Sequence, residues 1–257
     1  MRFSVIGSGS GGNSIFIQSD RSSLLIDAGF STKELKRRLE RLDISSFHIE
    51  ALLVTHEHND HIKGIGSVLK DTGAPLICNA PTLNGIIGKI NEIDTPYIIH
   101  TGQSIEIDDL QIETFSKCHD AADPIGVIIS HRGIRLGIIT DLGRSTYLVE
   151  DRLKFCHALI IEFNHDLKML HEGPYPLELK RRIRGNQGHL SNEQASRLLN
   201  SVCHRDLKVV VLAHLSKVNN IDKIAYMEAE KALRSGGLDN TRIMISYQDK
   251  STPLISI

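Results

Sequence analysis

The hydrophobic residues of the first quarter of the chain fall into short runs that Gly, Ser and Asp separate. This pattern predicts strands at RFSVIG, SIFIQS, SSLLIDAG and ALLVT, because short runs rich in β-branched residues between turn residues are typical of strands. The segment TKELKRRLERL differs, since Leu35, Leu39 and Leu42 recur with the period of one helix face. We therefore expect a strand-rich N-terminal region that contains one early helix.

The rest of the chain continues with strands and then alternates between strands and helices. The middle contains PLICN, a helix expected at TLNGIIGKI, and four runs that predict consecutive antiparallel strands, SIEIDD, LQIETFS, PIGVIIS and IRLGIITD. The last third predicts strands at HALIIEF, LKVVVLAH and TRIMISY, and helices at PLELKRRIRG, SNEQASRLLNSV and KIAYMEAEKALRS. Strands beside helices in both halves predict sheets that are covered on their outer faces. Because no linker, repeat or low-complexity tract stands out, we expect one domain over residues 1–257.

Charge and cysteine usage narrow the class of protein. Lys and Arg total 30 against 31 for Asp and Glu, so no global charge attracts nucleic acid or an anionic membrane. The four cysteines form no C-x-x-C pair, which favours reduced thiols over a disulfide framework. No apolar run approaches the roughly 18 residues that a bilayer span requires. We expect a cytoplasmic protein with no membrane partner.

The glycine-rich segment GSGSGGNS raises the question of a nucleotide-binding loop. Gly7, Gly9 and Gly12 satisfy the spacing G-x-G-x-x-G. That fingerprint binds a pyrophosphate only when a helix follows the glycines, and here the strand-like NSIFIQS follows. We therefore interpret the segment as a hairpin turn, with Gly12 and Asn13 suited to positive φ.

The segment THEHNDHIKG, directly after ALLVT, is the strongest chemical signal in the chain. His56 and His58 alternate along an extended segment and so point the same way, and Asp60 and His61 follow at the expected start of a helix. Imidazole nitrogens together with a carboxylate suit zinc, manganese or iron, and the absence of cysteine from this segment argues against a thiolate site. The segment therefore predicts a metal site.

Three more metal-binding residue types stand where apolar strands end. His119 follows LQIETFSKC, Asp141 follows IRLGIIT, and His214 follows LKVVVLA. Loops at strand ends are where binding and catalytic residues are commonly placed on a rigid scaffold. Singly each residue could be structural, but together with THEHNDH they form a candidate set.

In this order the motifs resemble the metallo-β-lactamase fold superfamily: LLIDAG, THEHNDH, His119, ITDLG and LAHLS. The resemblance covers nearly the whole chain and implies an α/β fold, the four-layer αββα sandwich, with two divalent metal ions at one edge of the sheets. It also implies a role for each motif residue. One ion would be held by His56, His58 and His119, the other by Asp60, His61 and His214, with Asp141 bridging and Asp27 orienting the ligands.

Two departures exclude other branches of that superfamily. Lactam-hydrolysing members generally carry cysteine where this chain has Asp141, which disfavours hydrolysis of β-lactams. Only 72 residues lie between Asp141 and His214, too few for the clamp domain of some nucleases. GSGSGGNS, THEHNDHIKG, EFNHD, RIRGNQGHLSN and LAHLSKVNN are similar to the YycJ/WalJ/VicX-like subfamily, which implies a 5′ to 3′ exonuclease on double-stranded DNA.

The chemical requirements of phosphodiester hydrolysis suggest roles for further residues. The two ions would supply a hydroxide nucleophile, and Asp60 and His189 are the predicted catalytic residues, His189 as proton donor or phosphate ligand. His189 lies just before Ser191, a candidate N-cap with Gln194 three residues later. A basic cluster, Lys180, Arg181, Arg182 and Arg184, precedes it, although such clusters are commonly solvated surface. The candidate substrate-binding residues are Glu162, His165, Lys180, Arg184, Ser191 and Asn192.

Two alternatives stay open at this stage. The same metal core could serve a small-molecule hydrolase that cleaves a thioester, a lactone or a cyclic phosphodiester. Neutral net charge and 5% aromatic residues offer no stacking platform for single strands, which weakens the nuclease hypothesis, while the basic turn beside His189 supports it. A binding module without catalysis is disfavoured because every expected ligand position is filled. Histidine and aspartate do not distinguish zinc from manganese.

Overall fold

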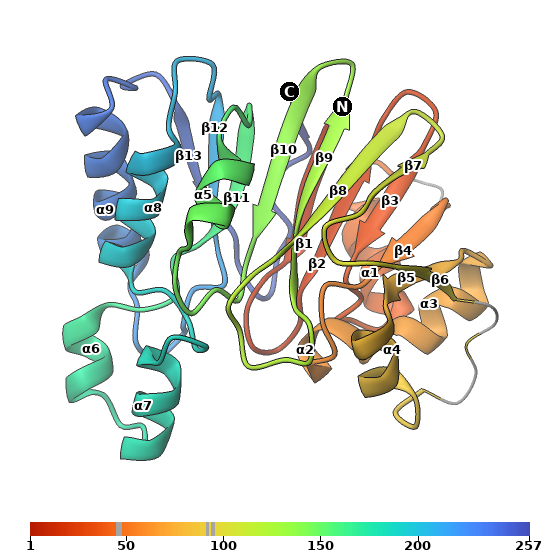
Figure 1. The fold of residues 1–257 in the computed structure, drawn as a ribbon, viewed down its shortest axis with the longest axis horizontal. Coiled ribbons are helices and arrows are strands. Elements are labelled where there is room, and N and C mark those ends of the chain that lie inside the picture. The colour runs from red at the N-terminus through yellow and green to blue at the C-terminus, as the bar shows by residue number, and fades with distance from the viewer. Residues whose placement is uncertain (45–47, 91–92, 94–95) are drawn as a thin grey trace.

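Two β-sheets face each other in the computed structural model, which describes residues 1–44, 48–90, 93 and 96–257 (Figure 1). The first half of the chain supplies most of one sheet and the helices that cover it. Its strands are β1 (Arg2–Gly7), β2 (Ser14–Gln18), β3 (Ser23–Ile26), β4 (Ala51–Leu53), β5 (Leu76–Asn79) and β6 (Tyr97–Ile99). Its helices are α1 (Thr32–Glu40), α2 (Asn59–Ile62), α3 (Ile65–Thr72) and α4 (Ala80–Ile86).

The second half supplies the other sheet and returns one strand to the first. Its strands are β7 (Ser104–Ile107), β8 (Leu110–Ser116), β9 (Ile125–His131), β10 (Ile134–Ile139), β11 (Ala158–Glu162), β12 (Val209–Ala213), β13 (Arg242–Ile245) and β14 (Ile255–Ser256). Its helices are α5 (Tyr147–Leu153), α6 (Leu167–Glu172), α7 (Leu177–Arg184), α8 (Asn192–Val202) and α9 (Asp222–Ser235).

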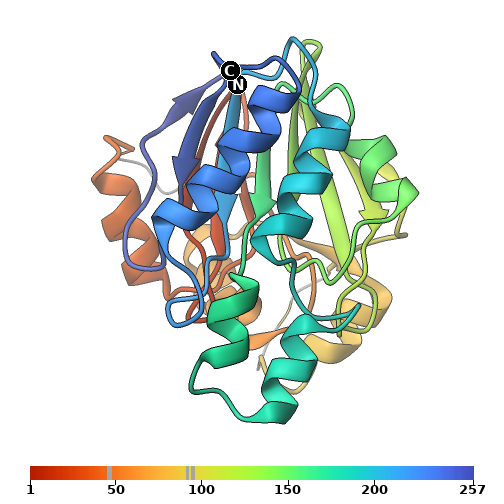
Figure 2. The same cartoon turned by 90° about the vertical axis from the view of Figure 1, so that its left-hand side faces the viewer.

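Both sheets are mixed. The strand order is β14-β1-β2-β3-β4-β5-β6 in the first sheet and β13-β12-β11-β10-β9-β8-β7 in the second. Strands β7 to β10 pair antiparallel in succession, as the sequence predicts, whereas β10 to β13 pair in parallel. The chain ends lie side by side, where Ile257 N donates to Met1 O at 3.0 Å (Figure 2).

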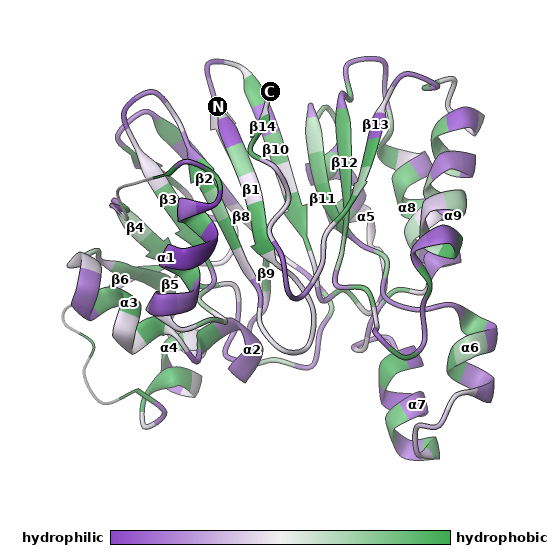
Figure 3. Ribbon diagram, turned by 180° about the vertical axis from the view of Figure 1, so that it is seen from behind, coloured by the Kyte–Doolittle hydropathy of each residue, from purple (hydrophilic) through white to green (hydrophobic). Residues whose placement is uncertain are grey.

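Apolar residues fill three layers. One buried cluster, which includes Phe3, Val127 and Ile160, lies between the sheets. The other two lie under the helices that cover each outer face, with Leu35 in one and Leu198 in the other. Figure 3 shows mostly hydrophobic strands and hydrophilic outer helix surfaces. The predicted four-layer αββα sandwich is confirmed. No helix in the described ranges is long and apolar enough to cross a membrane.

Helix α7 is formed where the sequence predicts it, but it covers no sheet. None of its residues is buried, and with α6 it extends beyond one edge of the sandwich (Figures 1 and 2). The helix therefore lies beside the carboxyl ends of β11 and β12 rather than on the outer face of a sheet.

The glycine-rich segment is a hairpin turn, as predicted, because β1 and β2 pair antiparallel. The expectation of positive φ at Gly12 and Asn13 is wrong, since the positive φ of 140° falls on Gly9. Gly12 is required for a different reason: a Cβ there would lie 2.4 Å from the carbonyl oxygen of Gly29. The Asn13 side chain donates to Asp60 Oδ2 at 3.0 Å, so the turn supports a predicted metal ligand.

Arg38 ties the N-terminal hairpin to the C-terminal segment, and we expect Arg38→Met to lower the free energy of unfolding by about 2–4 kcal/mol. The Arg38 side chain is buried, and its Nη1 donates to the carbonyl oxygens of Ile6 at 2.7 Å and Gln248 at 3.0 Å. Methionine leaves both carbonyls without that donor. Chemical denaturation of the variant and the wild type measures the difference.

Arg37→Met is the matched control. Arg37 lies on the same helix and also pairs with Glu34, but its side chain is 41% exposed. Exposed ion pairs contribute about 0–1 kcal/mol, so this variant should unfold nearly as the wild type does. Equal losses in the two variants would contradict the role given to Arg38.

Candidate metal centre

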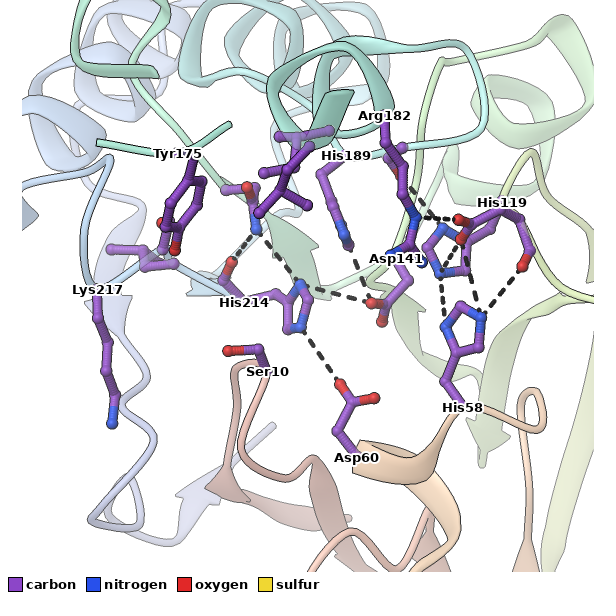
Figure 4. A pocket seen from close by; sticks show the side chains of 17 residues that line it. Ser10, His58, Asp60, His119, Asp141, Tyr175, Arg182, His189, His214 and Lys217 are labelled. Carbon is purple, nitrogen blue, oxygen red and sulfur yellow. Dashed lines mark hydrogen bonds and ion pairs between the residues drawn. The ribbon is translucent and has the colours of Figure 1, made fainter. Parts of the chain in front are cut away.

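The predicted metal ligands meet at one edge of the sandwich, where parallel strands of both sheets end. A cavity of about 320 Å³ lies there, between the loops after β4, β8, β10 and β12 and helix α7. Figure 4 shows His58 and His119 on one side of it, Asp60 and His214 on the other, and Asp141 between them. The titratable residues that line the cavity are His58, Asp60, His119, Asp120, Asp141, Tyr175, Arg182, His189, His214 and Lys217.

Three of the predicted residues follow strands in the same unusual backbone conformation. Asp27, Asp141 and His214 have positive φ values of 58°, 54° and 55°. Non-glycine residues adopt this left-handed region uncommonly, and such conformations concentrate at functional sites. Each of these residues turns the chain sharply at the point where its strand ends.

His56, His58 and His119 form the first candidate ligand group, with one nitrogen of each within 4.8 Å of the others. Hydrogen bonds fix which nitrogen is free. His58 Nε2 donates to the Asp120 carbonyl at 3.1 Å, and His119 Nδ1 donates to the Gly188 carbonyl at 3.2 Å. The remaining nitrogens, His58 Nδ1 and His119 Nε2, face each other at 3.2 Å. A cation between these lone pairs would be stabilised by both.

Asp60, His61 and His214 form the second candidate ligand group, and Asp141 lies between it and the first. His61 Nε2 lies 3.3 Å from Asp141 Oδ2 and 3.6 Å from Asp60 Oδ2, and His214 Nε2 lies 3.8 Å from Asp60 Oδ2. Asp141 Oδ2 and His214 Nε2 are buried without a hydrogen-bond partner among the described residues, as is His56 Nε2 in the first group. Buried polar atoms are nearly always paired, so these three atoms fit a bound cation.

Asp27 lies behind the ligands. Its carboxylate accepts from Thr55 N at 2.8 Å, Thr55 Oγ1 at 2.9 Å and His61 Nδ1 at 2.7 Å. The bond from His61 Nδ1 leaves Nε2 directed at Asp141. This geometry fits the orienting role that the sequence predicts for Asp27.

Electrostatics set the charge states of the ligand residues before a cation binds. Burial raises the pKa of Asp141, but His214 and His61 outweigh it and hold that pKa well below its usual range. For His214, burial lowers the pKa and Asp141 and Asp60 raise it, to about 9. Burial, with the cationic His61 and Lys117, keeps the pKa of His56 well below its usual range. The ionised Asp141 and the neutral His56 suit a divalent cation such as zinc or manganese, and such a cation would displace the proton that Asp141 and Asp60 stabilise on His214.

His189 lies between the two ligand groups. Its ring centroid is 5.3 Å from that of His119 and 5.0 Å from that of His214. His189 Nδ1 donates to Glu162 Oε1 at 3.0 Å, which leaves Nε2 to carry a proton or bind a ligand. It does not cap α8, because Ser191 is the N-cap and forms a capping box with Gln194.

The fully buried Glu162 holds His189 rather than lining the cavity. Its carboxylate also accepts from the backbone N–H groups of Leu142 at 2.9 Å and Leu190 at 3.1 Å. The sequence predicted Glu162 as a substrate contact, but its oxygens are already used by these three donors. It is therefore a positioning residue for His189.

Five other predicted substrate contacts also lie outside the cavity. Lys180 Nζ donates to the His171 carbonyl at 2.7 Å, and Arg184 is exposed on another side of α7. Buried hydrogen bonds occupy the polar residues near α8: Ser191 caps it, and Asn192 donates to Asn220 Oδ1 at 2.8 Å. His165 is fully buried beside Asn164.

Sequence reasoning did not single out Asp120, and it treated Arg182 only as one member of a basic cluster. Arg182 Nε donates to Asp120 Oδ2 at 2.6 Å, and both residues line the cavity. Asp120 Oδ1 is 3.4 Å from His119 Nε2. The position of Asp120 next to His119 in KCHD was the signal available in the sequence.

The sequence relatives agree with the fold. A sequence model of the β-lactamase superfamily domain matches residues 22–215. Exodeoxyribonuclease YycJ of Bacillus anthracis is 35% identical over 239 residues, which cover 92% of this chain and 90% of that protein. Exodeoxyribonuclease WalJ of Streptococcus pneumoniae is 31% identical over 264 residues, covering 100% and 98%. The chain therefore belongs to the metallo-β-lactamase superfamily, in the YycJ/WalJ subfamily.

Solved structures show the same fold at low sequence identity. The metallo-β-lactamase fold protein YhfI from Bacillus subtilis matches with a TM-score of 0.73 and 15% identity, covering 98% of both chains. The short form of human tRNase Z matches with a TM-score of 0.66 and 14% identity over 100% of both. With its family and its ligand groups, the chain is a metal-dependent hydrolase.

Proposed function

We propose that this chain, acting as one domain, is a two-metal exonuclease that degrades double-stranded DNA in the 5′ to 3′ direction. The observation that carries the proposal is the close approach of two sets of side chains to Asp141: His56, His58 and His119 form one set, and Asp60, His61 and His214 the other. They lie beside a cavity with Arg182 at its wall. Two relatives named exodeoxyribonucleases, at 35% and 31% identity over nearly their full lengths, support a nucleic acid substrate.

The residues present would hold two ions at this site. His56, His58 and His119 would bind one, Asp60, His61 and His214 the other, and Asp141 would contact both. When bound, two divalent cations activate a water as the nucleophile and neutralise charge on the phosphate oxygens. Zinc and manganese both suit this donor set.

The chain's own side chains supply the other requirements of phosphodiester hydrolysis. His189 Nε2 would donate a proton to the leaving alkoxide; the bond from Nδ1 to Glu162, which fixes the ring, supports this role. Arg182 offers guanidinium N–H groups at the cavity wall, where they can pair with a non-bridging phosphate oxygen. Asp120 fixes the Arg182 side chain by accepting from Nε.

A small-molecule hydrolase is the second candidate. The cavity volume of about 320 Å³ lies within the range of small-ligand sites. A thioester, a lactone or a cyclic phosphodiester would each fit such a volume. None of these substrates would need the arginines around the cavity. The two candidates differ in what the wild-type enzyme hydrolyses best.

A substrate panel decides between them. We expect the metal-loaded enzyme to hydrolyse linear duplex DNA with a higher kcat/KM than cyclic nucleotides, thioesters or lactones. We expect chelation to remove the activity and added Mn²⁺ or Zn²⁺ to restore it. Metal-dependent hydrolysis of a thioester or lactone, with duplex DNA left intact, would refute the nuclease proposal in favour of the second candidate.

A further inference from the structure

A second cleft, of about 790 Å³, lies directly beside the metal cavity. We call it the arginine cleft; residues 116–124, Arg144, Arg181, Arg182 and residues 185–188 line it. It shares His119, Asp120, Arg182 and Gly188 with the metal cavity, so the two spaces meet at the Arg182–Asp120 pair. The cleft therefore continues the path of any long substrate that reaches the metal ligands.

Two arginines of this cleft are more available to a ligand than its acidic side chains. Within the described ranges, Arg144 and Arg181 form no ion pair. Asp120 is already paired with Arg182, and Asp123 Oδ2 accepts from Thr101 Oγ1 at 2.6 Å and Asn79 Nδ2 at 3.1 Å. Two guanidinium groups are thus left for an anionic ligand.

The walls of the cleft are fixed relative to one another. Gly143 N donates to the Cys118 carbonyl at 2.8 Å, and Asp120 N donates to the Gln187 carbonyl at 3.0 Å. A Cβ on Gly143 would lie 2.3 Å from the Asn186 carbonyl oxygen, so this loop packs closely on the turn after α7. The backbone beside Arg144 is therefore fixed relative to the turn after α7, and Arg144 and Arg181 line the same cleft.

We propose that the arginine cleft binds a phosphate of the nucleic acid strand whose scissile phosphate occupies the metal cavity. This inference rests on the proposed nuclease function. Guanidinium groups bind phosphate oxygens through paired N–H donors, and phosphate contacts position a nucleic acid without reading its sequence. The cleft would bind either a backbone phosphate or a terminal 5′-phosphate, which share this chemistry.

Arg144→Gln and Arg181→Gln test the proposal against two substrates. For duplex DNA we expect each variant to lower kcat/KM about tenfold, the loss of one charge-assisted contact. The magnitude of the salt slope of log kcat/KM should fall by about 1 in each. Hydrolysis of bis(p-nitrophenyl) phosphate, which cannot reach the cleft, should be unchanged. Arg205→Gln, a 93% exposed arginine before the opposite end of β12, is the matched control.

The possible outcomes distinguish a failure of the arginine cleft from a failure of the proposed nuclease function. Duplexes with 5′-phosphate and 5′-hydroxyl ends identify the source, since a loss confined to the phosphorylated duplex indicates the terminal phosphate. Unchanged kcat/KM and salt slope for DNA in both variants would overturn the arginine cleft while leaving the nuclease function intact. An equal loss on bis(p-nitrophenyl) phosphate would also overturn it. A wild type that cleaves only the small diester would refute the nuclease function and this inference with it.

Discussion

Asp141→Asn is expected to lower kcat/KM by about a thousandfold or more, because it removes the anionic oxygen between the two ligand groups. Asp141 Oδ2 lies 3.3 Å from His61 Nε2, and Asp141 Oδ1 lies 3.5 Å from His214 Nδ1. Without this charge, the binding of two cations loses its shared ligand. Metal content per chain, measured by mass spectrometry, should fall from two ions to one or fewer.

Asparagine is a better replacement for Asp141 than alanine. A carboxylate elsewhere in the chain, Asp109, provides the control. Asp141 has a φ of 54°, which asparagine tolerates better than alanine, so the fold should be retained. Asp109 also pairs with a histidine, His131, at 3.1 Å, but at the opposite edge of the sandwich. Asp109→Asn should keep full metal content and activity. A metal-loaded, fully active Asp141→Asn would show that the site is assigned wrongly.

His189→Gln is expected to lower kcat for DNA about 10²- to 10³-fold while metal content stays at the wild-type level. His189 lies at the cavity wall between the ligand groups, with Nδ1 bonded to Glu162. Glutamine retains a donor in place of the Nδ1–H but has no group that can deliver a proton. Steady-state kinetics and metal analysis of the same preparation give both quantities.

The leaving group distinguishes proton donation from structural support. An alkoxide needs a proton to leave, whereas p-nitrophenolate does not. We therefore expect His189→Gln to hydrolyse bis(p-nitrophenyl) phosphate at close to the wild-type rate. A loss as large as that on DNA would mean that His189 holds the cavity in shape and does not act as the acid.

Local sequence patterns predicted most of the fold but not the elements with weak patterns. The strands around THEHNDH and the four antiparallel strands carry clear alternation or apolar runs. Strand β6 has only three residues, two of them exposed, and α6 has one buried residue, so neither offers a period to detect. A single domain over residues 1–257 stays a prediction.

Candidate metal ligands are easier to predict from the sequence than candidate substrate contacts. Ligand types at strand ends are conspicuous, although their roles in binding metal stay predictions. Helix α7 shows the opposite case: Lys180 and Arg184 share one face, while Leu179, Arg182 and Ile183 share another and line the cavity. Leu179 and Ile183 mark the face of α7 that lines the cavity. The composition of the helix alone does not show which face this is.

The most direct test of the account is digestion of a linear duplex labelled at the 5′ or the 3′ end of one strand, with Mn²⁺ or Zn²⁺ supplied and Asp141→Asn beside the wild type. We expect early release of the 5′ label as short products and progressive shortening of the 3′-labelled strand, both lost in Asp141→Asn. An intact duplex with a fully metal-loaded wild type, or the same digestion in Asp141→Asn, would contradict it.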